Sequence, residues 1–138
     1  MAFAASRRVL GRRWPVVAAI AFTAVMALAE PWLPETFPVW SLAGAALVYP
    51  ICGTLELRRG RPGRIALGLA GVALFTALAL VSLALGDDLG RYVLAAGWLG
   101  HAVWDYAHHR AGKVVPRWYA EWCGVVDVLV AAALLLLP

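Results

Sequence analysis

All three histidines of the chain and one aspartate lie between His101 and His109, in a segment that is otherwise apolar. If this segment is an α-helix, with about 100° of rotation per residue, Asp105 lies about 40° from His101 and His108 about 20° from it. His109 lies about 80° round the same helix, at the edge of this polar stripe. The spacing therefore predicts a row of groups able to bind metals or protons on one helix face, and we include His109 among the candidate ligands.

Imidazole and carboxylate groups on one face suit three kinds of chemistry. The first is a metal site in which His101, Asp105 and His108 bind zinc, iron or manganese, with Asp127 or Glu56 completing the shell. The second is metal-free acid–base catalysis by a carboxylate paired with a histidine. The third is a path for protons or metal ions. A structural interpretation stands beside these, because polar groups in membrane helices also form interhelical hydrogen bonds worth about 0.6–2 kcal/mol each.

The composition is that of a multi-pass membrane protein. Of the 138 residues, 63% are hydrophobic and only 14% are charged, and the mean hydropathy is +0.78. Soluble domains average about 25% charged residues. The pI of about 9.6 would suit a nucleic-acid partner, but the basic residues occur in short runs between apolar segments, as in membrane topology signals. We expect one helical transmembrane domain over residues 1–138 and no nucleic-acid partner.

Five apolar runs predict an all-α bundle of five transmembrane helices. Each run approaches the roughly 20 residues that a bilayer requires. Prolines interrupt the chain between the first two runs, and Pro50 predicts a kink inside the second. The third run carries Gly68 and Gly71, which permit close helix approach. The predicted helices cover about residues 14–29, 39–57, 65–85, 92–109 and 118–137.

The basic residues predict the orientation of this bundle. The N-terminus, the turn at 58–64 and the loop at 110–117 hold four, four and three of the twelve lysines and arginines. The other side holds Arg91 together with acidic residues. Because cytoplasmic loops are enriched in Lys and Arg, we predict a cytoplasmic N-terminus and an external C-terminus, in the inner (cytoplasmic) membrane.

With this orientation, polar groups of three helices share the cytoplasmic half of the bundle. Tyr119, Cys123 and Asp127 are four residues apart on one face of the last helix, and Glu56 lies in the last turn of the second. Glu56 has a second interpretation, as an ion pair with the adjacent arginines. Cys123 likewise suits simple packing as a small apolar residue.

Four residues are candidates for the wall of a substrate pocket. Trp98 and Trp104 lie on either side of the polar stripe, and Tyr119 and Cys123 face it from the last helix in the predicted arrangement. The two tryptophans equally suit the aromatic belts at a membrane surface.

The motif of the last two helices resembles that of one known group of proteins. The pattern His101-x-x-Trp104-Asp105-x-x-His108-His109, followed by Cys123-x-x-x-Asp127, is similar to a small membrane family of four to five spans in bacteria and fungi. That family has no established function, so the resemblance implies a site without naming its chemistry. The first 90 residues match it only in being apolar.

We predict a membrane-embedded enzyme whose pocket opens toward the cytoplasmic leaflet and takes a lipid, an isoprenoid or another apolar substrate. Hydrolysis, isomerisation and cyclisation all fit. The predicted catalytic residues are Asp105, His101, Asp127 and Glu56. The alternatives are a component that binds or transports protons or divalent cations, for which a homo-oligomer is expected, and a structural accessory subunit. Membrane lipids are the expected surroundings in every case.

Overall fold

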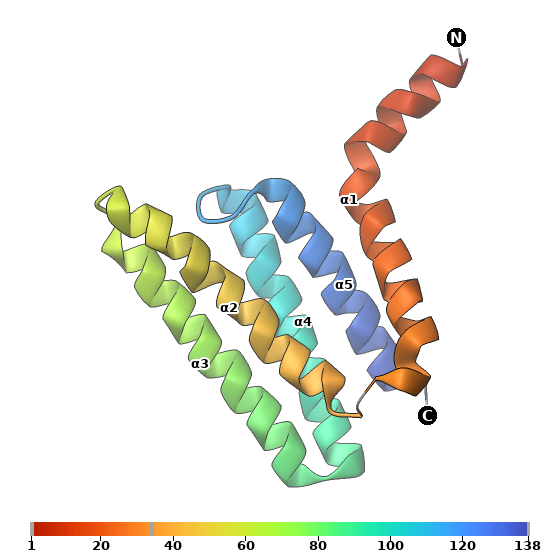
Figure 1. Ribbon diagram of the computed structural model, residues 1–138, viewed down its shortest axis with the longest axis vertical. Helices are drawn as coiled ribbons and strands as arrows, with labels where there is room; N and C mark the ends of the chain where they lie inside the picture. The colour runs from red at the N-terminus through yellow and green to blue at the C-terminus, as the bar shows by residue number, and fades with distance from the viewer. Residues whose placement is uncertain (1, 34, 138) are drawn as a thin grey trace.

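The computed structural model describes the backbone of residues 2–33 and 35–137, and the side chains of these ranges except residues 2–12 and Asp87. Over these residues the chain is all-α, as predicted (Figure 1). The elements are α1 (Ala2–Ala29), a short 3-10 helix η1 (Glu30–Trp32), α2 (Phe37–Arg58), α3 (Pro62–Leu85), α4 (Asp87–Ala111) and α5 (Arg117–Leu136).

Prolines and glycines set the helix ends near the predicted positions. The predicted break after α1 is present as η1, and Pro38 lies in the first turn of α2, where its missing N–H needs no partner. Pro34, part of the same predicted break, lies outside the described residues. Gly112 ends α4 with φ +60°, and its N–H donates to the carbonyl of His108.

The first helix is longer than the predicted segment. It begins at Ala2 rather than near residue 14 and continues through Pro15. The added residues include several alanines and arginines, which favour helix. In Figure 1 this first part of α1 extends beyond the other helices.

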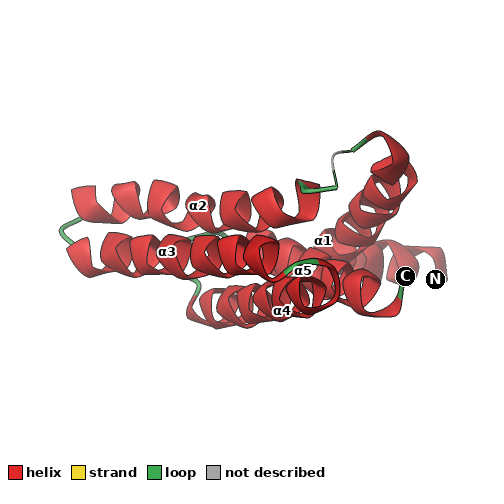
Figure 2. Cartoon of the chain, turned by 90° about the horizontal axis from the view of Figure 1, so that it is seen from below, coloured by secondary structure: helices red, strands yellow, loops and turns green. Residues whose placement is uncertain are grey.

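Helices α2 to α5 share one apolar core, and α1 joins it from the side. The largest interfaces are those of α2 with α3 and of α4 with α5, and α3 also packs on α4 (Figure 2). The core residues are Val39, Leu42, Ala46, Phe75, Ala79, Leu94, Trp98 and Ala131. Contacts of α1 are chiefly with α5, including Trp14 against Trp118 and Phe22 against Trp122.

Four helices are long and apolar enough to cross a membrane. They are Arg13–Trp32, Phe37–Arg58, Pro62–Leu85 and Arg117–Leu136. The segment predicted as a span at 92–109 is helical, but α4 is not among the four, because it carries the histidines, several charged residues and three glycines. Large apolar side chains such as Leu74 and Val103 are exposed on the outside of the bundle, and exposed apolar surface of this kind marks an interaction site, such as a membrane.

The helices alternate in direction, so the loops gather at two ends. The N-terminus, the α2–α3 turn and the α4–α5 loop lie at one end of Figure 1, at the top. The α1–α2 connection, the α3–α4 turn and the C-terminus lie at the other. The segments that hold eleven of the twelve lysines and arginines are therefore at one end of the bundle.

The interface between α2 and α3 depends on the close approach of Gly68 to Pro50, which lies inside α2. A Cβ atom at Gly68 would lie 2.8 Å from the Pro50 nitrogen and 3.0 Å from its Cα. These are backbone atoms, which cannot move without separating the helices. We expect Gly68→Ala to lower the free energy of unfolding by about 1–3 kcal/mol, measured by thermal denaturation in detergent.

Gly44 provides the matched control for this substitution. It lies in α2 with nothing within 4 Å of the added Cβ, so Gly44→Ala should leave stability unchanged or raise it slightly. Equal melting temperatures for the two variants would contradict the packing argument.

Candidate functional site

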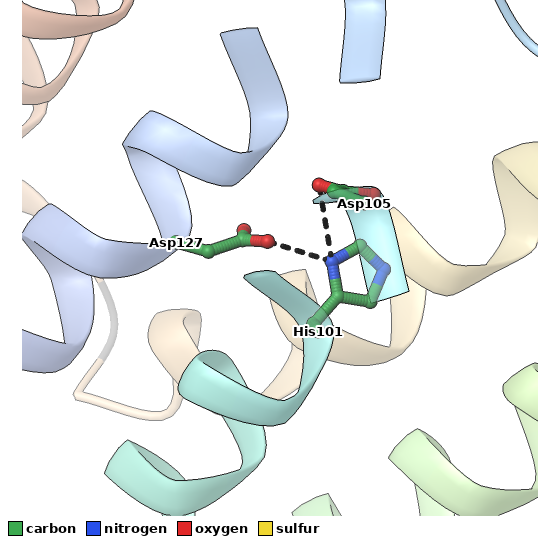
Figure 3. Close-up of side chains that lie close together, drawn as sticks. All are labelled: His101, Asp105 and Asp127. Carbon is green, nitrogen blue, oxygen red and sulfur yellow. Dashed lines mark hydrogen bonds and ion pairs between the residues drawn. The ribbon is translucent and has the colours of Figure 1, made fainter. Parts of the chain in front are cut away.

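His101, Asp105 and Asp127 come together near the middle of the bundle (Figure 3). His101 and Asp105 are one turn apart on α4, and Asp127 projects toward them from α5. None of the three is more than 2% exposed. Such complete burial of ionisable groups is costly unless they pair with one another or bind an ion.

The imidazole of His101 lies between the two carboxylates. Its Nδ1 is 2.8 Å from Asp127 Oδ2 and 3.6 Å from Asp105 Oδ2. A carboxylate can only accept, so without an ion the hydrogen bond to an ionised Asp127 places a proton on Nδ1. Binding of a metal ion by this nitrogen would release that proton or move it to Nε2. The contact links α4 to α5 inside the apolar core.

Tyr49 adds a third helix to the site. Its hydroxyl donates a hydrogen bond to Asp105 Oδ1, and the residue is 1% exposed. Sequence reasoning missed it. No periodic signal was available, because α2 is apolar at nearly every position; only the structure shows that Tyr49 lies on the buried face of α2, with Leu42, Ala46, Gly53 and Glu56.

Aromatic rings enclose the polar group. Phe75 of α3 lies edge-on to the imidazole of His101, with 4.8 Å between ring centroids, and Tyr49 lies edge-on to Trp104 at 5.9 Å. The Trp104 ring packs so closely on α3 that a Cβ at Gly71 would lie 2.9 Å from it. These contacts exclude water from the site and strengthen electrostatic interactions inside it.

Two buried polar atoms of the site have no hydrogen-bond partner among the described residues. They are His101 Nε2 and Asp105 Oδ2. A buried group without a partner costs about 1–3 kcal/mol. The site therefore has capacity to bind a further proton or cation, beyond its own hydrogen bonds.

The three side chains have the composition of a site for a divalent metal. Each offers one ligand atom, and these atoms lie within 4.8 Å of one another. Ligands bound at about 2.0–2.2 Å to one ion are at most about 4.4 Å apart, so small side-chain rotations bring the group to ligand distance. One imidazole and two carboxylates suit zinc, iron or manganese.

The other histidines lie apart from this group. His108 is buried, but its Nδ1 is 2.9 Å from the carbonyl oxygen of Trp104, and its ring packs on Tyr49 at 4.4 Å. His109 Nδ1 is 3.0 Å from the carbonyl oxygen of Arg117. Each ring thus has Nδ1 at a backbone carbonyl near the end of α4, and neither residue belongs to the group whose ligand atoms lie within 4.8 Å of one another.

The predicted residues of α5 lie beside the group without joining it. Cys123 is buried one turn before Asp127, and Tyr119, one further turn away, is half-buried. Cys123 is a free thiol. Their predicted role in a substrate pocket stays a prediction.

Glu56 has a different set of partners. Its carboxylate is bound by three arginines of the α2–α3 turn, Arg59, Arg61 and Arg64. It lies two turns beyond Tyr49 on α2, about 10 Å along the helix. The structure thus matches the ion-pair interpretation of Glu56 and does not bring it to His101.

An apolar groove of about 580 Å³ lies between α1 and the helices that carry the site. Trp98 and Val126 line it, and they are three residues before His101 and one residue before Asp127. Trp98 is buried, with no hydrogen-bond partner for its Nε1 among the described residues. Trp104 is not among the lining residues.

Comparison of the chain with protein-family models, with curated proteins and with solved structures gives no match. The resemblance of the helix motif to one membrane family therefore gains no support from these comparisons. The structure supports a coarser statement: several apolar helices surround a buried His/Asp group, as in a membrane protein.

Removal of the Tyr49 hydroxyl tests the hydrogen bond that ties α2 to the site. Tyr49→Phe leaves Asp105 Oδ1 buried without its donor, so we expect the free energy of unfolding to fall by about 1–2 kcal/mol. Thermal denaturation in detergent measures this. Tyr92→Phe, at an exposed position of the same bundle, should have no effect, and an equal loss in both variants would contradict the assignment.

Proposed function

We propose that this chain is a metal-dependent enzyme embedded in a membrane, with His101, Asp105 and Asp127 as its metal ligands and an apolar molecule as its substrate. The supporting observation is the convergence of these three fully buried side chains from two helices. We further propose five transmembrane helices with a cytoplasmic N-terminus. The position of α4 among the four apolar helices and the basic residues at one end support this arrangement.

Charge balance favours a divalent cation at this position. Two ionised carboxylates and a neutral imidazole carry two negative charges, which a divalent ion neutralises in full. Without an ion, the site becomes neutral only by taking up two protons, for example one on His101 and one on a carboxylate. A net charge in an apolar interior costs several kcal/mol, and a divalent ion removes it while both carboxylates stay ionised.

The residues of the site have separate roles in this proposal. A divalent ion held by the three ligands would polarise an oxygen of the substrate or of water. Tyr49 positions Asp105 through its hydroxyl and leaves Oδ2 of that carboxylate available. Phe75 and Trp104 exclude bulk water. Glu56 is not part of the proposed ligand set, because three arginines bind its carboxylate. His108 is left out because it does not belong to the group whose ligand atoms lie within 4.8 Å of one another.

The apolar groove supports the choice of substrate class. Its volume lies within the range of about 300–1,000 Å³ found for small-molecule sites. Most of its lining is apolar, including Phe22, Met26 and Val130, and two lining residues are close neighbours in sequence of His101 and Asp127. It lies toward the end of the bundle with Glu30 and Arg91, not toward the basic end where we predicted the pocket to open.

The transport alternative receives less support from the same contacts. The hydrogen-bonded series Tyr49–Asp105 and His101–Asp127 runs from α2 through α4 to α5, across the bundle rather than along it. Toward the end of the bundle with the α3–α4 turn, the buried polar side chain among the described residues is Ser82. Its hydroxyl donates to the carbonyl of Ala79 in its own helix. A path along the membrane normal would need further polar groups there.

Metal content is the direct test. Protein purified in detergent without added metal or chelator should hold close to one zinc, iron or manganese ion per chain, measured by inductively coupled plasma mass spectrometry. His101→Ala and Asp127→Asn should each lose most of this metal, because a two-ligand remnant binds weakly.

His109→Ala is the matched control. It removes an imidazole from the same helix without touching the group, so metal content should be unchanged. Wild-type protein without metal would exclude the metal site. Equal metal loss from all three variants would show that the ion binds elsewhere or to unfolded protein.

A further inference from the structure

A cluster of arginines surrounds one buried carboxylate at the turn between α2 and α3. The turn has the sequence Arg58-Arg59-Gly60-Arg61-Pro62-Gly63-Arg64. Glu56, in the last turn of α2, is 2% exposed. We name Arg59, Arg61 and Arg64, together with Glu56, the arginine cluster.

The arginines of the cluster are held in fixed positions by hydrogen bonds to the buried carboxylate of Glu56. Arg59 Nη1 is 2.7 Å from Glu56 Oε1, Arg61 Nη1 is 3.2 Å from Oε2, and Arg64 Nη1 also bonds to Oε2. The carboxylate thus holds three guanidinium groups that would otherwise repel one another. Arg59 and Arg61 remain 66% and 55% exposed, so their outer faces are accessible to a ligand.

The backbone of the turn is equally constrained. The N–H groups of Arg59 and Arg61 both donate to the carbonyl of Glu56, and Gly60 takes φ +74° to reverse the chain. Pro62 then begins α3. The arginines are therefore presented from a short connection between two packed helices, which reduces the conformational entropy lost on binding.

The cluster carries a surplus of positive charge and of hydrogen-bond donors. The turn and Glu56 together hold four arginines and one glutamate. Each guanidinium has five N–H groups, and the cluster uses one contact per arginine on Glu56. The remaining donors match an anion with several oxygens, and guanidinium groups in a fork arrangement are well suited to phosphate.

The position of the cluster indicates which kind of molecule would carry this phosphate. It lies at the end of two helices that are apolar enough to cross a membrane, next to the exposed side chains of Leu55 and Leu57. Apolar surface directly beside a phosphate-binding group suits a molecule with both a phosphate and hydrocarbon chains. Anionic lipid head groups attract Lys and Arg residues that lie at the surface of a membrane.

We propose that Glu56 organises Arg59, Arg61 and Arg64 into a binding site for the phosphate of an anionic phospholipid head group. This site is separate from the His101 group and does not depend on the function proposed for it.

The test is lipid binding by the full chain in detergent, measured by native mass spectrometry with phosphatidylglycerol, phosphatidylcholine and inorganic phosphate as probes. Wild-type protein should retain phosphatidylglycerol at least about tenfold more tightly than phosphatidylcholine. Both lipids carry a phosphate, but the choline cation of phosphatidylcholine cancels its charge and is repelled by the arginines, and about 1.4 kcal/mol of such repulsion is a factor of ten. Equal affinity for the two lipids would overturn the proposal. Inorganic phosphate that binds as tightly as phosphatidylglycerol would exclude a lipid as the occupant.

A matched pair of double variants distinguishes specific binding by the arginine cluster from attraction by net positive charge alone. Arg59→Gln/Arg61→Gln and Arg110→Gln/Lys113→Gln each remove two exposed positive charges from the same end of the bundle. The first pair should weaken phosphatidylglycerol binding by about a hundredfold and the second by much less. Equal losses would show that only net charge matters and would overturn the proposal.

Glu56→Gln distinguishes these two explanations, because they predict opposite changes in the affinity for phosphatidylglycerol. It increases the net positive charge, so attraction by charge alone predicts tighter binding of phosphatidylglycerol. The proposal predicts weaker binding, because the arginines lose the carboxylate that holds them together. If this variant does not fold, as judged by its melting temperature, the pair of double variants decides the question.

Discussion

The contact of one imidazole with two carboxylates inside an apolar bundle is the constraint on which the centre of this structure depends. His101 joins α4 to α5 through Asp127, and Asp105 joins α4 to α2 through Tyr49. Three helices must therefore keep their register at this level, because a shift of one residue would leave ionisable groups buried without partners. The cost of such an error is several kcal/mol, far more than the loss of one apolar contact.

The fourth helix of the core, α3, contributes to the site through its close packing rather than through polar side chains. α3 approaches α2 closely at Gly68 and accommodates the ring of Trp104 at Gly71. Small residues at these two positions let Phe75 reach the imidazole of His101 and cover it. Water is thus excluded from the polar group because α3 packs closely on its neighbours. At this level α3 itself has no ionisable side chain.

The charged residues divide into regions that differ in exposure and in chemistry. The central group is buried and acidic around one histidine, whereas the arginine cluster is exposed and basic around one glutamate. In both places a single group of opposite charge holds its neighbours together. The two places differ in the sign of their excess charge. The central group has more carboxylates than histidines and suits a cation, whereas the turn has more guanidinium groups than carboxylates and suits an anion.

Much of this was readable from the sequence, because it depends on local rules. The apolar runs and the prolines and glycines between them predicted the helices. The i, i+4 spacing predicted the shared face of His101 and Asp105, which one helix alone determines. Tertiary structure decided which other groups meet there: Tyr49 joins them, His108 turns to its own backbone, and Glu56 pairs with arginines. Nearly every position of these helices is apolar, so periodicity does not rank their faces, and only packing between helices selects the partners.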